Sequence, residues 1–220
     1  MTLTVPDIPI SERFKSVQGE GVYTGTPMAF IRLQGCSVGK KICHYCDTDF
    51  DVLHSFRGGG KYTVRALADW VGDYKHVCLT GGEPLDEDWA GLIGELKRSG
   101  SPLVHVETSG TQYIPSYLDD AWICVSPKPG FHEAVIDRAD EVKVIVPGLG
   151  GAARSSPQDA GWPGLHDALR WANNGKIVFL QPRNNVLSID KGNLKFCIDA
   201  VAEHPNLRLS VQMHKILGVQ

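Results

Sequence analysis

The chain has 220 residues, of which 42% are hydrophobic and 21% are charged, and its formal net charge is −3 at pH 7. These values are close to globular averages, so they exclude disordered and fibrous classes of protein. A chain of this length can bury enough surface to fold without disulfides, yet it is shorter than the ~250 residues of a complete (β/α)8 barrel. The slightly negative charge argues against a broad nucleic-acid-binding surface.

The sequence shows no signal for export or for a membrane. The first residues, MTLTVPDIPI, lack the basic residues and the cleavage site of a signal peptide, and no run approaches about 18 uncharged apolar residues. We therefore expect a cytoplasmic protein with no membrane partner, whose six cysteines stay reduced. Cys78, Cys124 and Cys197 lie in apolar runs, which favours small buried hydrophobic residues for these three.

Short apolar runs alternate with longer amphipathic ones along the chain. The apolar runs predict strands at 28–34, 76–80, 103–107, 121–125, 142–146, 176–180 and 207–212. The amphipathic segments predict helices at 63–72, 86–98, 164–173 and 190–203, the first two with Thr63 and Asp86 as N-caps. This alternation indicates an α/β protein with a parallel sheet covered by helices, and active residues at the carboxyl ends of the strands.

Two segments interrupt the alternation. They are 57–60 (RGGG) and the irregular segment 148–164, where we expect a unit that has lost its helix. There is no internal repeat and no linker between two compositions, so a single domain over 1–220 is the better interpretation.

Three of the six cysteines, Cys36, Cys43 and Cys46, fall within eleven residues and follow the first predicted strand. The C-x6-C-x2-C spacing can bring three sulfurs to a common centre, as in iron–sulfur and zinc sites. Three ligands suit a 4Fe-4S cluster whose fourth iron is open to a small molecule. A fourth ligand from His44 or Cys78, a structural zinc ion, and redox-active thiols are the alternatives.

Other motifs surround these cysteines. Tyr45 precedes the third cysteine, although alone it would be a packing aromatic residue. The turn Gly81-Gly82-Glu83-Pro84 follows the second predicted strand, where two glycines permit close approach of backbone to a ligand. With the three cysteines, these residues resemble the radical S-adenosylmethionine (SAM) superfamily.

A longer set of segments narrows the resemblance to one family, the 7-carboxy-7-deazaguanine synthases. The set runs in order from residue 14 toward the end of the chain. It comprises FKSVQGEG (14–21), GTPMAFIRLQGC (25–36), CDTDF (46–50), LTGGEP (79–84), VETSG (106–110), VSPKP (125–129), EVKVIVP (141–147), QPRNN (181–185) and VQMHK (211–215).

The resemblance implies a ring contraction that converts 6-carboxy-5,6,7,8-tetrahydropterin to 7-carboxy-7-deazaguanine with release of ammonia, in queuosine and deazapurine biosynthesis. It implies a 4Fe-4S cluster, SAM and Mg2+ as cofactors, with a radical from SAM that takes hydrogen from carbon 6 and later returns it. The protein positions and shields this chemistry. The implied fold is an incomplete TIM-type barrel of about six parallel strands with fewer helices, the radical SAM core, with its gap at 148–164 and a cluster loop at 36–48.

The resemblance also assigns roles to residues that bind the cofactors. Cys36, Cys43 and Cys46 match the cluster ligands, and Thr48 matches a position that supplies an oxygen to Mg2+. Considered alone, Thr48 would be a turn hydroxyl and Lys128 a solvated charge. The positions that match SAM contacts are Tyr45, Gly82, Ser126, Pro127, Lys128, Gln181, Pro182, Arg183 and Asn184.

A second set matches the residues that bind the substrate. Arg32 is the most informative member, because a charge inside an apolar strand is costly unless it is paired. Its planar fork suits the substrate carboxylate, with an internal salt bridge as the alternative. Glu107 can accept from an amino-pyrimidine edge, and His214 is either a substrate contact or a core histidine. The full set is Val17, Gln18, Gly19, Arg32, Thr80, Glu107, His214 and Gln220.

Three features depart from the expected pattern. The x6 spacing differs from the x3 of most radical SAM enzymes, Asn184 stands where an acidic residue is expected, and the segment 148–164 matches no motif. An activase of glycyl-radical enzymes is the alternative enzyme, and a zinc-bearing binding module is the non-enzymatic alternative. The family implies a homodimer, since an incomplete barrel leaves edges to cover, and a flavodoxin- or ferredoxin-type electron donor.

Overall fold

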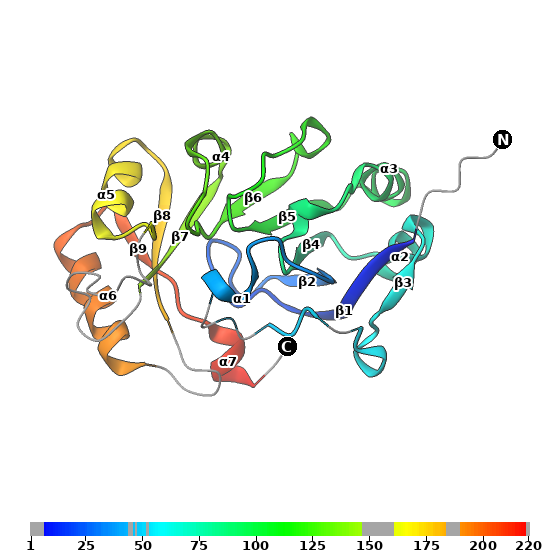
Figure 1. The fold of residues 1–220 in the computed structure, drawn as a ribbon, viewed down its shortest axis with the longest axis horizontal. Helices are drawn as coiled ribbons and strands as arrows, with labels where there is room; N and C mark the ends of the chain where they lie inside the picture. Colours follow the sequence, from blue (N-terminus) through cyan, green and yellow to red (C-terminus); the bar gives the residue numbers. More distant parts are fainter. Residues whose placement is uncertain are drawn as a thin grey trace.

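The computed structural model describes residues 7–43, 46, 48–51, 53–146, 161–183 and 190–218. These residues form a nine-stranded sheet in the order β3-β1-β2-β4-β5-β6-β7-β8-β9. Figure 1 shows the strands following one another along an arc. Seven of them form one parallel run: β2 (Pro27–Leu33), β4 (His76–Gly81), β5 (Leu103–Thr108), β6 (Trp122–Val125), β7 (Glu141–Val146), β8 (Ile177–Pro182) and β9 (Leu207–Leu209).

The α/β class expected from the sequence is confirmed, but about six parallel strands was too low a number. The sheet also has two antiparallel strands that the sequence analysis did not predict. β1 (Ile8–Val17) pairs with β2, and β3 (Gly60–Tyr62) pairs with β1. The sheet therefore combines a parallel run with an antiparallel edge.

The four predicted helices are present as α2 (Val64–Val71), α3 (Ala90–Ser99), α5 (Leu165–Asn173) and α6 (Lys191–Glu203). Three shorter ones were not predicted: α1 (Gly39–Ile42), α4 (Glu133–Arg138) and α7 (Met213–Leu217). Figure 1 shows α2 to α6 along the outer side of the arc, with α1 and α7 on its inner side. Among the described residues, no helix combines the length and the apolar character that crossing a membrane requires.

The two predicted N-caps differ in outcome. Thr63 caps α2 as expected, because its side chain accepts from the Ala66 N–H at 3.1 Å. Asp86 does not cap α3, which begins only at Ala90; Asp86 instead ends a short 3-10 helix that starts at Pro84. The N-cap of α3 is Trp89, which makes no side-chain cap bond, while the Ala90 N–H donates to the Asp88 carboxylate at 2.9 Å.

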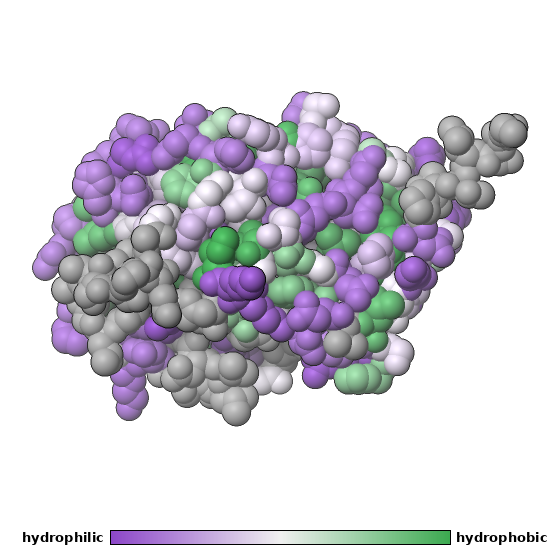
Figure 2. All heavy atoms as spheres, viewed as in Figure 1, coloured by the Kyte–Doolittle hydropathy of each residue, from purple (hydrophilic) through white to green (hydrophobic). Residues whose placement is uncertain are grey.

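The two faces of the sheet differ in chemistry. The outer face packs its apolar side chains against the helices and holds the main core, for example Ile31, Leu79 and Ile123, which are fully buried. The alternate residues of the same strands face inward and include charged side chains such as Arg32 and Lys143. Figure 2 shows that the visible surface is mainly hydrophilic, with hydrophobic residues gathered near its centre. The inner face is therefore mixed, since Met28, Phe30 and Cys78 form a second, smaller apolar cluster on it.

The expected gap in the barrel does not lie at 148–164. Residues 148–160 are outside the described part of the chain. However, β7 and β8 are direct neighbours from Glu141–Ile177 to Val146–Pro182, and α5 precedes β8, so this unit keeps both its strand pairing and a helix. The open edges are β3 and β9. The unit with a reduced helix is β5 to β6, whose connection contains only the 3-10 helix Ser116–Leu118.

Candidate active site

Two adjoining cavities open at the carboxyl ends of the strands. One, the cysteine cavity, is lined by Cys36, Cys43 and Cys46 among others. The other, the arginine cavity, is lined by Arg32 among others. Both are lined by Thr48, Glu107 and Gln212, so these three residues form their common boundary.

The three clustered cysteines are free, half-buried thiols that face one cavity. Burial raises the pKa of Cys43 to about 11, against the opposing effect of nearby Lys128. Burial also raises the pKa of Cys36. The neighbouring Ser37 is fixed by the Asp86 carboxylate, which accepts from its N–H at 2.8 Å and its hydroxyl at 2.7 Å. The raised pKa values of Cys36 and Cys43 favour the protonated thiols, so a metal centre that binds here would have to displace their protons.

The Gly81-Gly82-Glu83-Pro84 turn lies directly beneath the cluster loop. A Cβ atom added at Gly82 would collide with the Gly35 carbonyl oxygen, so the turn and the loop can approach this closely only with glycine. Glu83 is fully buried, and its carboxylate accepts from the Thr108 hydroxyl at 2.7 Å and the Ser109 N–H at 2.8 Å. Glu83 therefore ties the ends of β4 and β5 together.

Most of the residues expected to contact SAM line the cysteine cavity, namely Gly82, Ser126, Lys128, Gln181, Pro182 and Arg183. Pro127 is buried and is not part of the lining. Tyr45 and Asn184 lie outside the described residues. Lys128 is not the solvated charge of the alternative interpretation: its ammonium donates to the Ser126 carbonyl at 2.7 Å, and burial lowers its pKa.

The arginine cavity gathers seven of the eight residues predicted to bind substrate: Val17, Gln18, Gly19, Arg32, Thr80, Glu107 and His214. They come from the end of β1, from β2, β4 and β5, and from α7. Gln220 lies outside the described residues. His214 is half-buried in α7 and does not belong to the core, contrary to its alternative interpretation.

Arg32 forms the internal ion pair of its alternative interpretation, and its binding to a substrate carboxylate stays a prediction. Its Nε donates to Glu12 Oε1 at 2.7 Å, which is the expected internal salt bridge. No described residue accepts a hydrogen bond from either Nη atom, and the side chain lines the cavity. The guanidinium is thus held from one side and offers its other donors to a ligand.

The loop after β1 reaches the opposite end of the sheet. The Met213 N–H donates to the Gly19 carbonyl at 3.0 Å, and the Gly21 N–H donates to the Ser210 hydroxyl at 3.3 Å. A Cβ atom at Gly19 would collide with the His214 ring. These contacts join the β1–β2 side of the arc to the segment that follows β9.

Sequence reasoning missed two charged residues of this site. Lys143, in the middle of β7, donates to Glu20 Oε2 at 2.6 Å and to Glu107 Oε2 at 2.7 Å, and its side chain is only 2% exposed. Burial alone would raise the pKa of Glu20, but the adjacent Lys143 ammonium lowers it to about 2. The signal that singled out Arg32, a charge inside an apolar strand, is equally present at Lys143.

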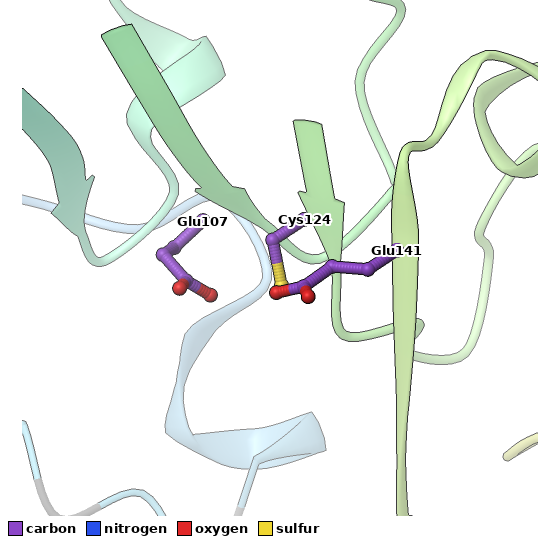
Figure 3. Close-up of side chains that lie close together, drawn as sticks. All are labelled: Glu107, Cys124 and Glu141. Atoms are coloured by element: carbon purple, nitrogen blue, oxygen red, sulfur yellow. The ribbon is translucent and has the colours of Figure 1, made fainter. Parts of the chain in front are cut away.

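A second group of acidic residues lies beside Lys143. Glu107, Cys124 and Glu141 come from three adjacent strands and point toward one another, with ligand atoms within 4.8 Å (Figure 3). Burial works against the charge of Lys143, but these acidic neighbours raise its pKa well above the usual value. Lys143 already supplies positive charge to this group, so we assign no metal ion to it. Among the described residues, the three clustered cysteine sulfurs do not all lie within 4.8 Å of one another.

A three-cysteine loop at the carboxyl end of a parallel sheet is the arrangement of radical SAM enzymes, and the comparisons with known proteins agree. The chain is 34% identical to 7-carboxy-7-deazaguanine synthase from Bradyrhizobium diazoefficiens and 35% identical to that from Bacteroides thetaiotaomicron; each match covers 96% of this chain and 98% of the relative. The chain belongs to the 7-carboxy-7-deazaguanine synthase family. The resemblance predicted from the sequence is therefore confirmed.

A solved structure gives the same result. The crystal structure of QueE from Escherichia coli superposes with a TM-score of 0.70 and 27% sequence identity, covering 94% of this chain and 95% of that chain. No protein-family model matches the chain. The two sequence relatives are synthases by name, and these comparisons lend no support to the activase alternative.

Proposed function

We propose that this protein is a radical SAM lyase that converts 6-carboxy-5,6,7,8-tetrahydropterin to 7-carboxy-7-deazaguanine with release of ammonia, in queuosine or deazapurine biosynthesis. Membership of the family supports this function. The observation that carries it is the pair of adjoining cavities with Thr48, Glu107 and Gln212 as their common boundary. A radical formed in the cysteine cavity would meet a substrate bound in the arginine cavity.

The cysteine cavity would hold the 4Fe-4S cluster and SAM. Its three free thiols and the side-chain donor of Lys128 fit such a pair of ligands. When bound, the reduced cluster supplies the electron that cleaves SAM. Cys36, Cys43 and Cys46 would bind three irons, and Gly82, Ser126, Lys128 and the 181–183 stretch would bind SAM. Tyr45, Pro127 and Asn184 remain predicted SAM contacts.

Thr48 would supply an oxygen ligand to Mg2+. It lies on the boundary of the two cavities, and no described residue bonds its hydroxyl. A hard cation that keeps several other ligands from substrate or water needs few protein oxygens. The position suits an ion that contacts the substrate during the rearrangement.

The arginine cavity would bind the pterin. The free Nη donors of Arg32 suit the substrate carboxylate as a fork. Glu107, with its carboxylate held by Gln18 and Lys143, would accept from the amino-pyrimidine edge. Val17, Gly19, Thr80 and His214 would complete the wall, and Gln220 remains a predicted contact.

The sheet would act as an incomplete barrel within a single domain. Its edges do not pair with each other among the described residues, but the loop after β1 bridges to the segment after β9. This bridge would restrict water around the radical, which protects a reactive intermediate. We further propose a homodimer, a flavodoxin- or ferredoxin-type electron donor and a cytoplasmic location, where reducing conditions suit six free cysteines.

Anaerobic turnover tests the proposed function. The reconstituted protein, a reductant, SAM, Mg2+ and the carboxytetrahydropterin should yield 7-carboxy-7-deazaguanine and ammonia, detected by mass spectrometry. SAM should be regenerated, so product should exceed the 5′-deoxyadenosine that accumulates. If full cluster loading and SAM binding give no deazaguanine, the proposal is wrong.

A further inference from the structure

Two carboxylates on the wall of the arginine cavity depend on a single buried cation. Lys143 Nζ lies 2.6 Å from Glu20 Oε2 and 2.7 Å from Glu107 Oε2. The side chain of Lys143 is 2% exposed, and those of Glu20 and Glu107 are 15% and 18% exposed. The lysine lies behind the cavity wall, while both carboxylates form part of it.

The remaining oxygens of the two carboxylates are fixed by amide donors. Glu20 Oε1 accepts from Gln181 Nε2 at 3.1 Å and from Gln212 Nε2 at 3.0 Å. Glu107 Oε1 accepts from Gln18 Nε2 at 3.1 Å. A carboxylate can accept about four hydrogen bonds, so Glu107 keeps acceptor sites free for a ligand.

Without Lys143, two carboxylates would share one small buried space. Like charges at such a distance cannot both stay ionised, so one of them would take up a proton. A protonated carboxyl group would then present a donor to the cavity, where a carboxylate presents acceptors. The cavity would lose its match to a ligand edge that carries N–H groups.

The charged groups around Lys143 support this role. The acidic groups that act on it are Glu20, Glu107, Glu141 and Cys124. The other basic residues that line the cavities are Arg32, Lys128, Arg183, His214 and Lys215. Arg32 is already paired with Glu12. Among the described residues, Lys143 is the cation that bonds both carboxylates.

We propose that Lys143 is a positioning residue that keeps Glu20 and Glu107 as fixed hydrogen-bond acceptors, so that the arginine cavity selects ligands whose pyrimidine edge carries an amino group. This inference rests on the proposed function, which supplies a pterin as the ligand. Lys143 itself does not touch the substrate. It acts through the two carboxylates.

The test compares two stable ligands on the reconstituted, SAM-loaded enzyme. One is 6-carboxypterin; the other is 6-carboxylumazine, in which an oxygen replaces the 2-amino group. Their affinities are measured anaerobically by fluorescence titration. A lost hydrogen bond to a charged acceptor corresponds to ~10- to 100-fold in affinity, so the wild type should prefer the pterin by at least ~10-fold.

In Lys143→Met this preference should collapse. Affinity for 6-carboxypterin should fall by ~10-fold or more, while affinity for 6-carboxylumazine should change by less than about threefold. In turnover, KM should rise more than kcat falls. A lysine that only stabilised the fold would change both affinities alike.

Lys176→Met is the matched control. The Lys176 ammonium also bonds within the fold, to the Ala139 carbonyl at 3.0 Å, but it lines neither cavity. This variant should keep the preference for the pterin. If Lys143→Met does not fold, Lys143→Gln, which keeps a donor and removes the charge, should show the same collapse.

Two results would overturn the inference: a wild type that does not distinguish the two ligands, or a Lys143 variant that still prefers the pterin as the wild type does. The proposed function is judged separately, because it depends on whether the wild type makes 7-carboxy-7-deazaguanine. A wild type that turns over while Lys143→Met keeps its preference would remove only the role of Lys143.

Discussion

Glu12 and Arg32 are direct partners across the antiparallel strands β1 and β2, and the Arg32 guanidinium donates to the Glu12 carboxylate at 2.7 Å. Arg57 approaches the other oxygen of Glu12 at 3.6 Å. The carboxylate thus aligns Arg32 from behind and leaves its Nη donors toward the cavity. The antiparallel edge of the sheet, which looks peripheral in Figure 1, therefore sets the direction of a residue in the candidate site.

Arg32→Lys should weaken binding of ligands that carry a carboxylate. Lysine keeps the charge but loses the fork, so the affinity for 6-carboxypterin should fall by ~10- to 100-fold. Glu12→Gln should cause a smaller loss, because the charge of Arg32 remains and only its alignment weakens. Fluorescence titration of the SAM-loaded enzyme measures both.

Pterin without the carboxylate is the control ligand for these two variants. Its affinity should be nearly the same in the wild type and in Arg32→Lys. An equal loss for both ligands would show that Arg32 supports the cavity as a whole and does not bind the carboxylate.

Cys43→Ala should prevent assembly of a complete cluster. Wild-type protein reconstituted without oxygen should contain about four irons and four sulfides per chain, and the variant clearly fewer. Cys78→Ala is the matched control, since Cys78 is a fully buried cysteine of β4 that does not line the cysteine cavity. It should keep the full iron content. A Cys43→Ala protein with four irons would exclude this ligand set.

The parallel strands and the longer helices could be predicted because each carries its own periodic signal. β1 could not, because a register shift between Ile10 and Glu12 interrupts its alternation, and β3 has only three residues. The helix α4 has six residues and no side-chain N-cap, so no local sequence signal predicts it. The prediction that Asp86 caps a helix was wrong because an acidic residue before an apolar stripe is typical of an N-cap. The sequence does not show whether its carboxylate bonds its own helix or, as here, the distant Ser37.

The candidate site likewise has one part that the sequence predicts and another that only the folded structure shows. The cysteines and the glycine turn are local motifs that directly follow two predicted strands. The sequence alone therefore predicts that they lie at adjacent strand ends. Lys143 bonds partners 123 and 36 residues away, so only the folded sheet shows what neutralises it. Glu83 belongs to a recognisable motif, yet its role as a buried anchor between β4 and β5 depends on the distant Ser109.

Asp86→Ala should make the cluster more labile with little effect on global stability. Asp86 is exposed, so losing its two bonds to Ser37 should cost less than about 1 kcal/mol of unfolding free energy. The cluster loop would then open more often, and the visible absorption should bleach several-fold faster in air. Asp88→Ala is the control: it removes the exposed bond to the Ala90 N–H, which should cost at most about 1 kcal/mol without faster bleaching. Equal bleaching rates in the wild type and Asp86→Ala would contradict the role of Asp86.

His105 should make the protein less stable in mild acid. Burial lowers its pKa to about 4, with a further effect from His76, whose Nδ1 lies 2.9 Å from His105 Nε2. In the unfolded chain this pKa is near 6.5, so between about pH 4 and 6.5 the unfolded state binds more protons and stability falls as the pH falls. The contribution of His105 to the free energy of unfolding is complete above about pH 6.5, and its loss by pH 4 is at most about 3 kcal/mol.

Urea unfolding at several pH values measures this effect. The free energy of unfolding should change less steeply with pH in His105→Gln, which can still bond His76 but cannot titrate. The exposed His166→Gln should keep the wild-type slope, and a His105→Gln slope equal to that of the wild type would assign the acid sensitivity to other groups.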